Sequence, residues 1–231
     1  MNQATEKKLL EIVRSNYETI AADFAVTRKK PLWPALVELA QRVRPGEKVL
    51  DVGCGTGRLL ESWVGKKIEY LGVDSSAGLI ALARKNYPEH KFQTGDMLAL
   101  DSLSETGFDY VFNIAALHHL PGENLRLAAL KQMAAKLAPH GKIILSVWNL
   151  RRQKKYLLLI FLSYCRHLFS KYRLDWGDIL FFWHDTQGAN VSERYYHAFT
   201  LRELKDISIS AGLKIERVAR DKFNYYLVLT K

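Results

Sequence analysis

A strand that runs directly into a glycine-rich turn is the most constraining feature of this chain of 231 residues. The apolar segment 48–52 is followed by Gly53, Gly55 and Gly57. Because glycine has no Cβ atom, such a turn allows positive φ angles and a close approach of the backbone to a ligand. The helix expected from residue 57 adds free N–H groups in its first turn. The pattern predicts a site for a nucleotide-like ligand at the end of a buried parallel strand.

The spacing of the glycines argues against a dinucleotide. A pyrophosphate-binding turn has the pattern G-x-G-x-x-G, and the position three residues after Gly55 holds Arg58. In doubly wound sheets an acidic residue about 20 positions further on binds ribose hydroxyls. Asp74, at the end of the next apolar segment, occupies that position. The turn alone fits an ordinary strand, turn and helix, but together with Asp74 it favours a nucleoside-containing ligand.

Strand and helix patterns alternate along most of the chain. Strands are expected near 48–53, 69–74, 91–95, 109–115 and 142–148, and helices near 57–64, 77–86 and 123–138. Further elements are expected as helices at 6–24, 33–43 and 200–211 and as a hairpin of 214–219 with 225–229. The alternation predicts an α/β, Rossmann-like sheet that is mostly parallel, with helices on both faces and an antiparallel hairpin at its C-terminal end.

The length fits a single domain with a full core. We expect an N-terminal helical segment (1–44), a cofactor-binding core (45–150), an insertion (151–191) and a C-terminal substrate segment with the last helix and the hairpin (192–231). The insertion contains an apolar run at 156–162, which predicts a helix followed by a lid or cap.

The composition indicates the kind of partner. Lys and Arg total 34 against 24 Asp and Glu, a formal net charge of +10, which favours an anionic partner such as nucleic acid. The apolar run at 156–162 is too short to span a bilayer, and the N-terminal residues lack a signal-peptide pattern. Cys54 and Cys165 form no zinc-binding spacing. We therefore expect a cytoplasmic protein without stable membrane insertion and without a metal site.

The first motif, D-x-G-x-G-x-G, resembles that of class I S-adenosylmethionine-dependent methyltransferases, whose sheet has seven strands. The resemblance implies that S-adenosylmethionine is the cofactor. It also implies a set of cofactor-binding residues, with the ammonium group at Asp51, the ribose at Asp74 and the adenine at Asp96 and Met97: Arg28, Asp51, Gly53, Gly55, Asp74, Ser75, Asp96, Met97 and Asn113.

Two further segments are candidates for contact with a substrate. Residues 113–119 follow the fourth strand and should line the ligand crevice, because strand carboxyl ends face it in open α/β sheets. His118 and His119 are adjacent, which disfavours a shared metal ion; we interpret them as a pocket wall, with general base as the alternative. Residues 192–199 fit an amphipathic strand that returns to the sheet, or a site where Arg194 binds an anion beside an aromatic ring.

Four segments together resemble a narrower family, the tRNA wobble-uridine methyltransferases that esterify 5-carboxymethyluridine. They are Thr27-Arg-Lys-Lys-Pro-Leu-Trp-Pro34, Ile114-Ala-Ala-Leu-His-His119, Val147-Trp-Asn-Leu150 and Arg194-Tyr-Tyr-His197. The resemblance implies tRNA as acceptor and a small zinc-binding activator as a partner. It implies Arg194, His197 and His118 as catalytic residues, and substrate contacts from Arg28, His118, Arg194, Tyr195 and His197.

Some positions depart from that family. Leu32 interrupts the usual Pro-Trp-Pro, Lys29 replaces a bulkier ring residue, and the stretch between Leu150 and Ser192 is shorter and more apolar than in the yeast-type enzyme. Two alternatives therefore stay open. One is a methyltransferase for a small metabolite carboxylate or quinone precursor, which the apolar insertion favours. The other is a non-catalytic subunit that binds RNA or a partner, which the intact Asp51, Gly53, Gly55 and Asp74 disfavour.

Overall fold

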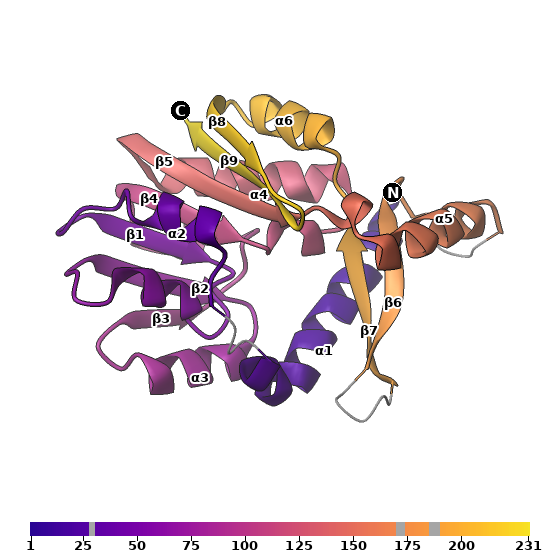
Figure 1. Cartoon of the computed structure of the whole chain (residues 1–231), viewed down its shortest axis with the longest axis horizontal. Coiled ribbons are helices and arrows are strands. Elements are labelled where there is room, and N and C mark those ends of the chain that lie inside the picture. Colours follow the sequence, from indigo (N-terminus) through magenta and orange to yellow (C-terminus); the bar gives the residue numbers. More distant parts are fainter. Residues whose placement is uncertain (28–30, 170–173, 185–189) are drawn as a thin grey trace.

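A seven-stranded sheet forms the centre of the computed structural model, which describes residues 1–27, 31–169, 174–184 and 190–231 (Figure 1). Its strands are β1 (Lys48–Val52), β2 (Glu69–Asp74), β3 (Lys91–Thr94), β4 (Phe108–Ile114), β5 (Leu137–Trp148), β8 (Lys214–Arg220) and β9 (Asn224–Thr230). They lie in the order β3-β2-β1-β4-β5-β9-β8. The first five are parallel, and β9 pairs antiparallel with both β5 and β8. The predicted fold class is confirmed.

Helices cover both faces because alternate strand residues point to opposite sides. Leu50 and Val52 lie in the core beneath α4 (Glu123–Lys136) and α6 (Leu201–Ser210). Val49 lies on the other face, beneath α2 (Pro34–Ala40) and α3 (Ala77–Asn86). Short 3₁₀ turns occur at η2 (Leu100–Ser102), η3 (Leu117–His119) and η4 (Leu150–Arg152). Local signals set helix starts: Ser76 Oγ accepts the Leu79 N–H, and Thr200 with Glu203 forms a capping box.

The segment after the glycine turn differs from the expected helix at 57–64. It is a 3₁₀ helix, η1 (Arg58–Trp63), preceded by Gly57 with φ of 78°. Leu59, Leu60 and Trp63 all pack into the core over these six residues. A 3₁₀ helix is tighter than an α-helix, with three residues per turn, and such helices occur as short connectors. The turn therefore does not lead into a long helix with an N-terminal ligand site.

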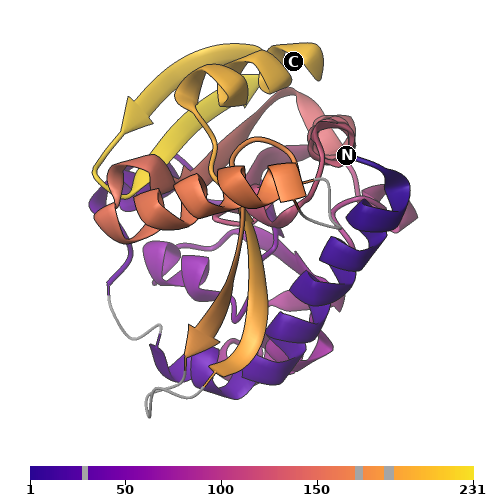
Figure 2. The ribbon, with the colours of Figure 1, turned by 90° about the vertical axis from the view of Figure 1, so that its right-hand side faces the viewer.

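The insertion contains more structure than predicted. Helix α5 (Lys154–Phe169) is followed by β6 (Asp178–His184), which pairs antiparallel with β7 (Asn190–His197) in a separate two-stranded sheet. The expectation that 192–199 returns to the main sheet is therefore wrong. The β6–β7 pair joins residues on either side of the expected boundary at 191 and 192. Figure 2 faces this pair, which packs against α5 and α1 (Gln3–Thr27).

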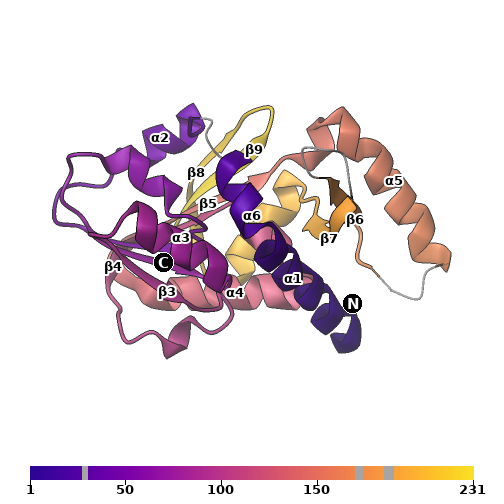
Figure 3. The same ribbon diagram turned by 90° about the horizontal axis from the view of Figure 1, so that it is seen from below.

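Helix α1 lies beside the carboxyl ends of the parallel strands. Figures 1 and 3 show it crossing that edge of the sheet, between the strand ends and the β6–β7 pair. Leu9 packs in a small cluster with Leu174 and Tyr195, so the apolar stripe of the helix is buried against the two-stranded sheet. The edge of a parallel sheet that holds ligands in such folds is thereby covered by the N-terminal helix.

Candidate functional site

The turn after β1 is packed so closely that only glycine fits at its first position. Gly53 has φ of 78°, and a Cβ atom there would lie 2.5 Å from Cβ of Ala116. The Gly53 N–H donates to the carbonyl of Val73 at 2.7 Å, which ties the turn to the end of β2. The turn and the ends of β2 and β4 thus form one continuous surface.

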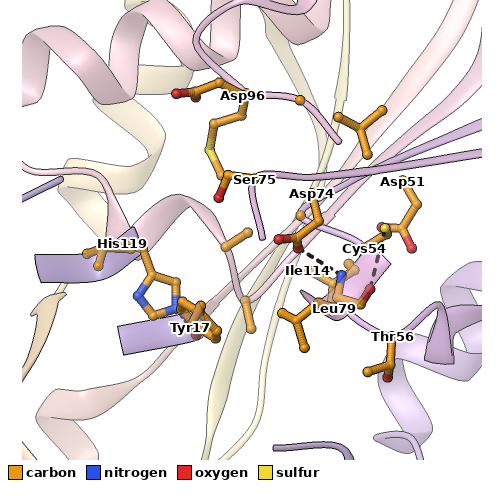
Figure 4. A pocket seen from close by; sticks show the side chains of 18 of the residues that line it. Tyr17, Asp51, Cys54, Thr56, Asp74, Ser75, Leu79, Asp96, Ile114 and His119 are labelled. Atoms are coloured by element: carbon orange, nitrogen blue, oxygen red, sulfur yellow. Dashed lines mark hydrogen bonds between the residues drawn. The ribbon is translucent and has the colours of Figure 1, made fainter. Parts of the chain in front are cut away.

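Asp74 connects this turn to the next helix. One carboxylate oxygen, Oδ2, accepts the Gly55 N–H at 2.9 Å (Figure 4). The other accepts the Ser76 N–H at 2.9 Å. Burial raises the pKa of Asp74, and these two hydrogen bonds oppose the rise. The carboxylate is therefore held in a fixed orientation at the end of β2.

Asp51 is a buried carboxylate without a cation beside it among the ion pairs of the described residues. The Tyr70 hydroxyl donates to its Oδ2 at 2.8 Å. The pKa of Asp51 is raised to about 7, mainly by burial and further by the charge of Asp74, against the lowering effect of the Tyr70 hydrogen bond. Such a group favours a cationic ligand, because a nearby positive charge stabilises its ionised form.

A cavity of about 560 Å³ lies over these groups. Its walls come from the ends of β1, β2, β3 and β4, from α1 and from the segment that enters α2. They include Lys7, Leu10, Arg14, Tyr17, Leu32, Trp33, Asp51, Gly53, Gly55, Thr56, Asp74, Ser75, Asp96, Met97, Ile114, Ala115, Ala116 and His119. Figure 4 shows Asp51 and Asp74 at one end, which we call the acidic end, and Tyr17 with His119 at the other.

Seven of the predicted cofactor-binding residues lie together on this cavity: Asp51, Gly53, Gly55, Asp74, Ser75, Asp96 and Met97. Their chemistry fits S-adenosylmethionine. A buried carboxylate suits the ammonium group, an oriented carboxylate suits ribose hydroxyls, and a thioether side chain suits a flat ring. Gly53 adds to this fit, because a Cβ atom there would collide with Ala116, which also lines the cavity.

One predicted cofactor-binding residue in the described part of the chain, Asn113, does not line the cavity. Asn113 lies fully buried beneath the floor, where its amide donates to the carbonyl of Val52 at 3.0 Å and accepts the Leu117 N–H at 3.0 Å. It therefore joins the ends of β1 and β4. Arg28 lies outside the described residues.

His119, rather than His118, faces the cavity. Its Nε2 is 2.7 Å from the hydroxyl of Tyr17, and its Nδ1 is 3.4 Å from the carbonyl of Tyr195. The two rings of Tyr17 and His119 meet edge to face at 5.1 Å between centroids. This pair forms the cavity wall opposite the acidic end.

His118 and Arg194 lie behind that wall in a buried aromatic cluster. The His118 ring is 5.2 Å from the rings of both Trp148 and Tyr196, and its Nδ1 accepts the backbone N–H of Trp148 at 3.4 Å. The Arg194 guanidinium donates to the Tyr196 hydroxyl at 3.1 Å. Neither His118 nor Arg194 is among the residues that line the cavity.

His197 and Tyr195 belong to a buried polar network. The two ring nitrogens of His197 are 2.7 Å from Asp178 and 2.6 Å from Glu203. The Tyr195 hydroxyl donates to Asp178 at 2.6 Å. Burial alone would raise the pKa of Glu203, but the hydrogen bond and charge of His197 outweigh it and hold the pKa below its ordinary value. The network joins β6 and β7 to α6, and neither predicted residue lines the cavity.

Several cavity residues were not singled out from the sequence as site residues. Tyr17 reads as one member of an apolar helical stripe, and Lys7 and Arg14 read as the solvated side of the same helix. These residues reach the cavity because α1 packs over the strand ends. That contact joins segments far apart in the sequence, so no local sequence pattern indicates it. Within the described ranges, no group of three or more His, Cys, Asp and Glu side chains is arranged to hold a metal ion.

Comparison with known proteins identifies the class. Residues 49–141 match the family model described as "Methyltransferase domain". A solved S-adenosylmethionine-dependent methyltransferase from Methanosarcina mazei has the same fold, with a TM-score of 0.67, 20% identity, and coverage of 87% of this chain and 99% of that one. The chain therefore contains a methyltransferase domain at residues 49–141, and S-adenosylmethionine is its cofactor.

Within that class the chain is similar to two proteins named tRNA (carboxymethyluridine(34)-5-O)-methyltransferase. The one from Schizosaccharomyces pombe is 28% identical over 237 residues, with 96% of both chains covered. The one from Saccharomyces cerevisiae is 35% identical over 152 residues, with 66% of this chain and 53% of that protein covered.

Several of the matched relatives are much longer than this chain. The chain spans about a third to a half of the length of several curated relatives that it matches, at 37%, 33% and 53%. A Haloferax volcanii methyltransferase, solved as a complex with the Trm112 methyltransferase activator, shares the fold, with a TM-score of 0.65, 16% identity, and 94% and 96% of the two chains covered.

Proposed function

We propose that this methyltransferase esterifies the carboxylate of 5-carboxymethyluridine at the wobble position of tRNA. The observation that carries the proposal is the similarity to the Schizosaccharomyces pombe protein of that name, which extends over 96% of both chains. The net charge of +10 agrees with an RNA substrate.

The acidic end of the cavity is the proposed cofactor side. When bound, S-adenosylmethionine supplies a methyl group that is activated by a sulfonium centre. In this proposal Asp51 holds the ammonium group, Asp74 with Ser75 binds the ribose, and Asp96 with Met97 holds the adenine. Gly53 and Gly55 allow the backbone to pass beneath the ligand. These residues share one cavity, which supports their assignment to one ligand.

The Tyr17–His119 wall is the proposed acceptor side. A carboxylate with an ordinary pKa near 4 is ionised at neutral pH, so methyl transfer to it needs alignment and removal of water but no general base. Tyr17 and His119 exclude water at that end and limit the approach of the acceptor. Lys7 and Arg14 add positive charge from α1, also on the cavity lining.

The residues behind the wall receive positioning roles in this proposal. Arg194 holds Tyr196, and Tyr196 packs against the His119 ring at 4.7 Å between centroids. His118 packs against the same two rings. His197 and Tyr195 anchor β7, the strand that carries Arg194 and Tyr196. The predicted direct contacts of these four residues with substrate, and that of Arg28, stay predictions.

A Trm112-type activator is the proposed protein partner. The support is that a fold neighbour was solved in complex with such an activator. Co-expression of the two proteins, followed by co-purification, tests this part. Zinc binding by that partner and a cytoplasmic location stay predictions.

Turnover on matched tRNAs tests the acceptor. A tRNA that carries 5-carboxymethyluridine should accept labelled methyl groups, whereas the same tRNA with an unmodified wobble uridine should not. Equal labelling of both would contradict the proposal. Labelling of neither, with turnover of a free carboxylic acid, would support the small-molecule alternative, which the apolar insertion favours.

A further inference from the structure

Four apolar side chains on one side of α5 are exposed to solvent. Leu157, Leu158, Phe161 and Leu162 are 48%, 63%, 61% and 45% exposed. Their spacing places them on a single side of the helix, which we call the α5 outer face. Exposed apolar side chains are normally scattered, and a contiguous group of them marks an interaction surface.

The packing of α5 does not account for these residues. Its inner side carries Tyr156, Leu159 and Ile160, which pack in one cluster with Ile179 of β6. Ser163 donates a hydrogen bond from its hydroxyl to the carbonyl of Asp178. Figure 1 shows α5 at the edge of the molecule, beyond the β6–β7 pair as seen from the main sheet. The outer face is therefore directed away from the core.

The same segment is strongly basic. Residues 151–174 contain seven Lys and Arg residues and no Asp or Glu. Arg152, Lys154 and Lys155, at the N-terminal end of α5, are exposed. The ammonium group of Lys155 lies over the Tyr156 ring, 4.6 Å from its centroid. The partner of this surface must accept both positive charge and apolar side chains.

The combination of exposed apolar side chains and positive charge distinguishes among three candidate partners: a second copy of the chain, RNA and a lipid bilayer. A second copy of the chain would bring two basic segments together, which like-charge repulsion disfavours. RNA would match the cations, but interfaces with nucleic acids are polar and would leave the leucines in water. A bilayer with anionic headgroups offers negative charge and an apolar layer at adjacent depths.

We infer that the α5 outer face binds peripherally to an anionic lipid bilayer, with Leu157, Leu158, Phe161 and Leu162 in the headgroup boundary and Lys154 and Lys155 at the phosphates. Within the described ranges, none of the helices has the length and apolarity that a membrane span requires. No α5 residue whose side chain the structure describes lines the cavity, so this inference goes beyond the proposed function and does not depend on it.

Flotation with unilamellar vesicles tests the inference. The full chain should float with vesicles of equimolar phosphatidylcholine and phosphatidylglycerol, and much less with phosphatidylcholine alone. Changing both Lys154 and Lys155 to Gln should weaken binding by about fivefold for each lysine. Joint substitution of the four outer-face residues by Ser should lower vesicle affinity roughly tenfold or more.

Matched controls separate this surface from general hydrophobicity. Val64 and Ile209 are also exposed, at 87% and 59%, but lie on other elements. Val64→Ser and Ile209→Ser should leave vesicle binding unchanged. Calorimetry with S-adenosylmethionine checks that every variant is folded.

Three results would overturn the inference. The first is absence of flotation with anionic vesicles by protein that binds the cofactor. The second is weaker tRNA binding by the outer-face variant without any vesicle binding, which would assign the face to RNA. The third is a concentration-dependent dimer that the outer-face variant abolishes, seen by analytical ultracentrifugation.

Discussion

Gly53 is the residue at which conformation and packing leave the fewest alternatives. Both a positive φ and the 2.5 Å approach to Ala116 exclude a side chain there. Gly53→Ala should therefore abolish measurable cofactor binding by calorimetry. Gly65→Ala is the matched control, because Gly65 has φ of 77° with nothing within 4 Å of the added Cβ. Gly65→Ala should lower the free energy of unfolding by only about 1 kcal/mol and leave the affinity for S-adenosylmethionine unchanged. Equal effects of the two substitutions would argue against a ligand beside Gly53.

Asp51 makes cofactor binding depend on pH. Its raised pKa of about 7 means that, as the pH falls below 7, the ligand-free protein increasingly holds a proton on this carboxyl. The ammonium group of the cofactor favours the ionised form, so binding releases that proton. Affinity should rise about tenfold per pH unit up to pH about 7 and then level off. Asp51→Asn should bind more weakly, with a flat profile. The same slope in the variant would exclude Asp51 as the titrating group.

The Tyr17–His119 pair predicts a selective effect on the acceptor. Tyr17→Phe removes a hydroxyl that lies 2.7 Å from His119 but leaves the acidic end of the cavity intact. We expect kcat/KM for the tRNA to fall about tenfold or more, because a buried partner is left unsatisfied, while affinity for S-adenosylmethionine is unchanged. Steady-state kinetics and calorimetry on one preparation measure both. Loss of cofactor affinity instead would place the pair on the cofactor side.

At this scale the sequence predicted the acidic end of the cavity better than the opposite wall. Asp51, the glycines and Asp74 follow from local spacing, since they adjoin strand ends. The choice between His118 and His119 depends on how η3 turns, which two adjacent histidines do not reveal. Tyr17 reaches the cavity only through the packing of α1 on β7.

At the scale of elements, the network of His197, Asp178 and Glu203 joins the β6–β7 pair to α6. His197→Ala would leave two carboxylates facing each other without a donor between them. We expect a loss of about 3 kcal/mol in free energy of unfolding, measured by urea denaturation. Arg202→Ala is the control, because Arg202 pairs with Asp206 on the exposed side of the same helix. It should cost less than about 0.5 kcal/mol. If His197→Ala lost no more free energy of unfolding than Arg202→Ala, the network would add no stability.

Glu203 gives the same network a pH dependence. Because its folded-state pKa is lowered, its stabilising effect is present above the unfolded-state pKa and is lost as the pH falls through the folded-state value. The melting temperature should therefore fall as the pH is lowered through the folded-state pKa of Glu203. Glu203→Gln should flatten that decline, and a parallel decline in the variant would assign it to other carboxylates.

The sequence pattern predicted the strands of the main sheet but not β6. Strand recognition relies on alternation between a buried and an exposed face. On β6, Ile179 packs with the α5 cluster and Leu180 with the α1 cluster, so apolar residues occupy both faces of the strand and the alternation disappears. The run Ile179-Leu-Phe-Phe-Trp183 is therefore equally compatible with a lid.

At the scale of the whole molecule, the charge of +10 predicts how binding responds to salt. Contacts with phosphates release counterions, so tRNA affinity should fall steeply and linearly on a double-logarithmic plot against salt concentration. Cofactor affinity should change little over the same range. Filter binding and calorimetry measure the two. Absence of salt dependence with tRNA would favour the small-molecule alternative.

The overall architecture was predictable because the α/β alternation and the terminal hairpin are local patterns. Two features could not be predicted from the sequence, because both depend on contacts between distant segments: the placement of α1 across the strand ends and the separate β6–β7 pair. The predicted division into four segments stays a proposal, and the pairing of β6 with β7 argues that the insertion and the start of the last segment fold together.

The chemical nature of the product tests the central claim most directly. Protein, labelled S-adenosylmethionine and tRNA carrying 5-carboxymethyluridine are incubated, and the tRNA is recovered and split into two portions. One portion is treated with mild alkali before digestion to nucleosides and mass spectrometry. Esterification predicts a labelled methyl ester of 5-carboxymethyluridine that alkali removes completely. Label that survives alkali would mean methylation at nitrogen, carbon or ribose, and would contradict a carboxylate acceptor.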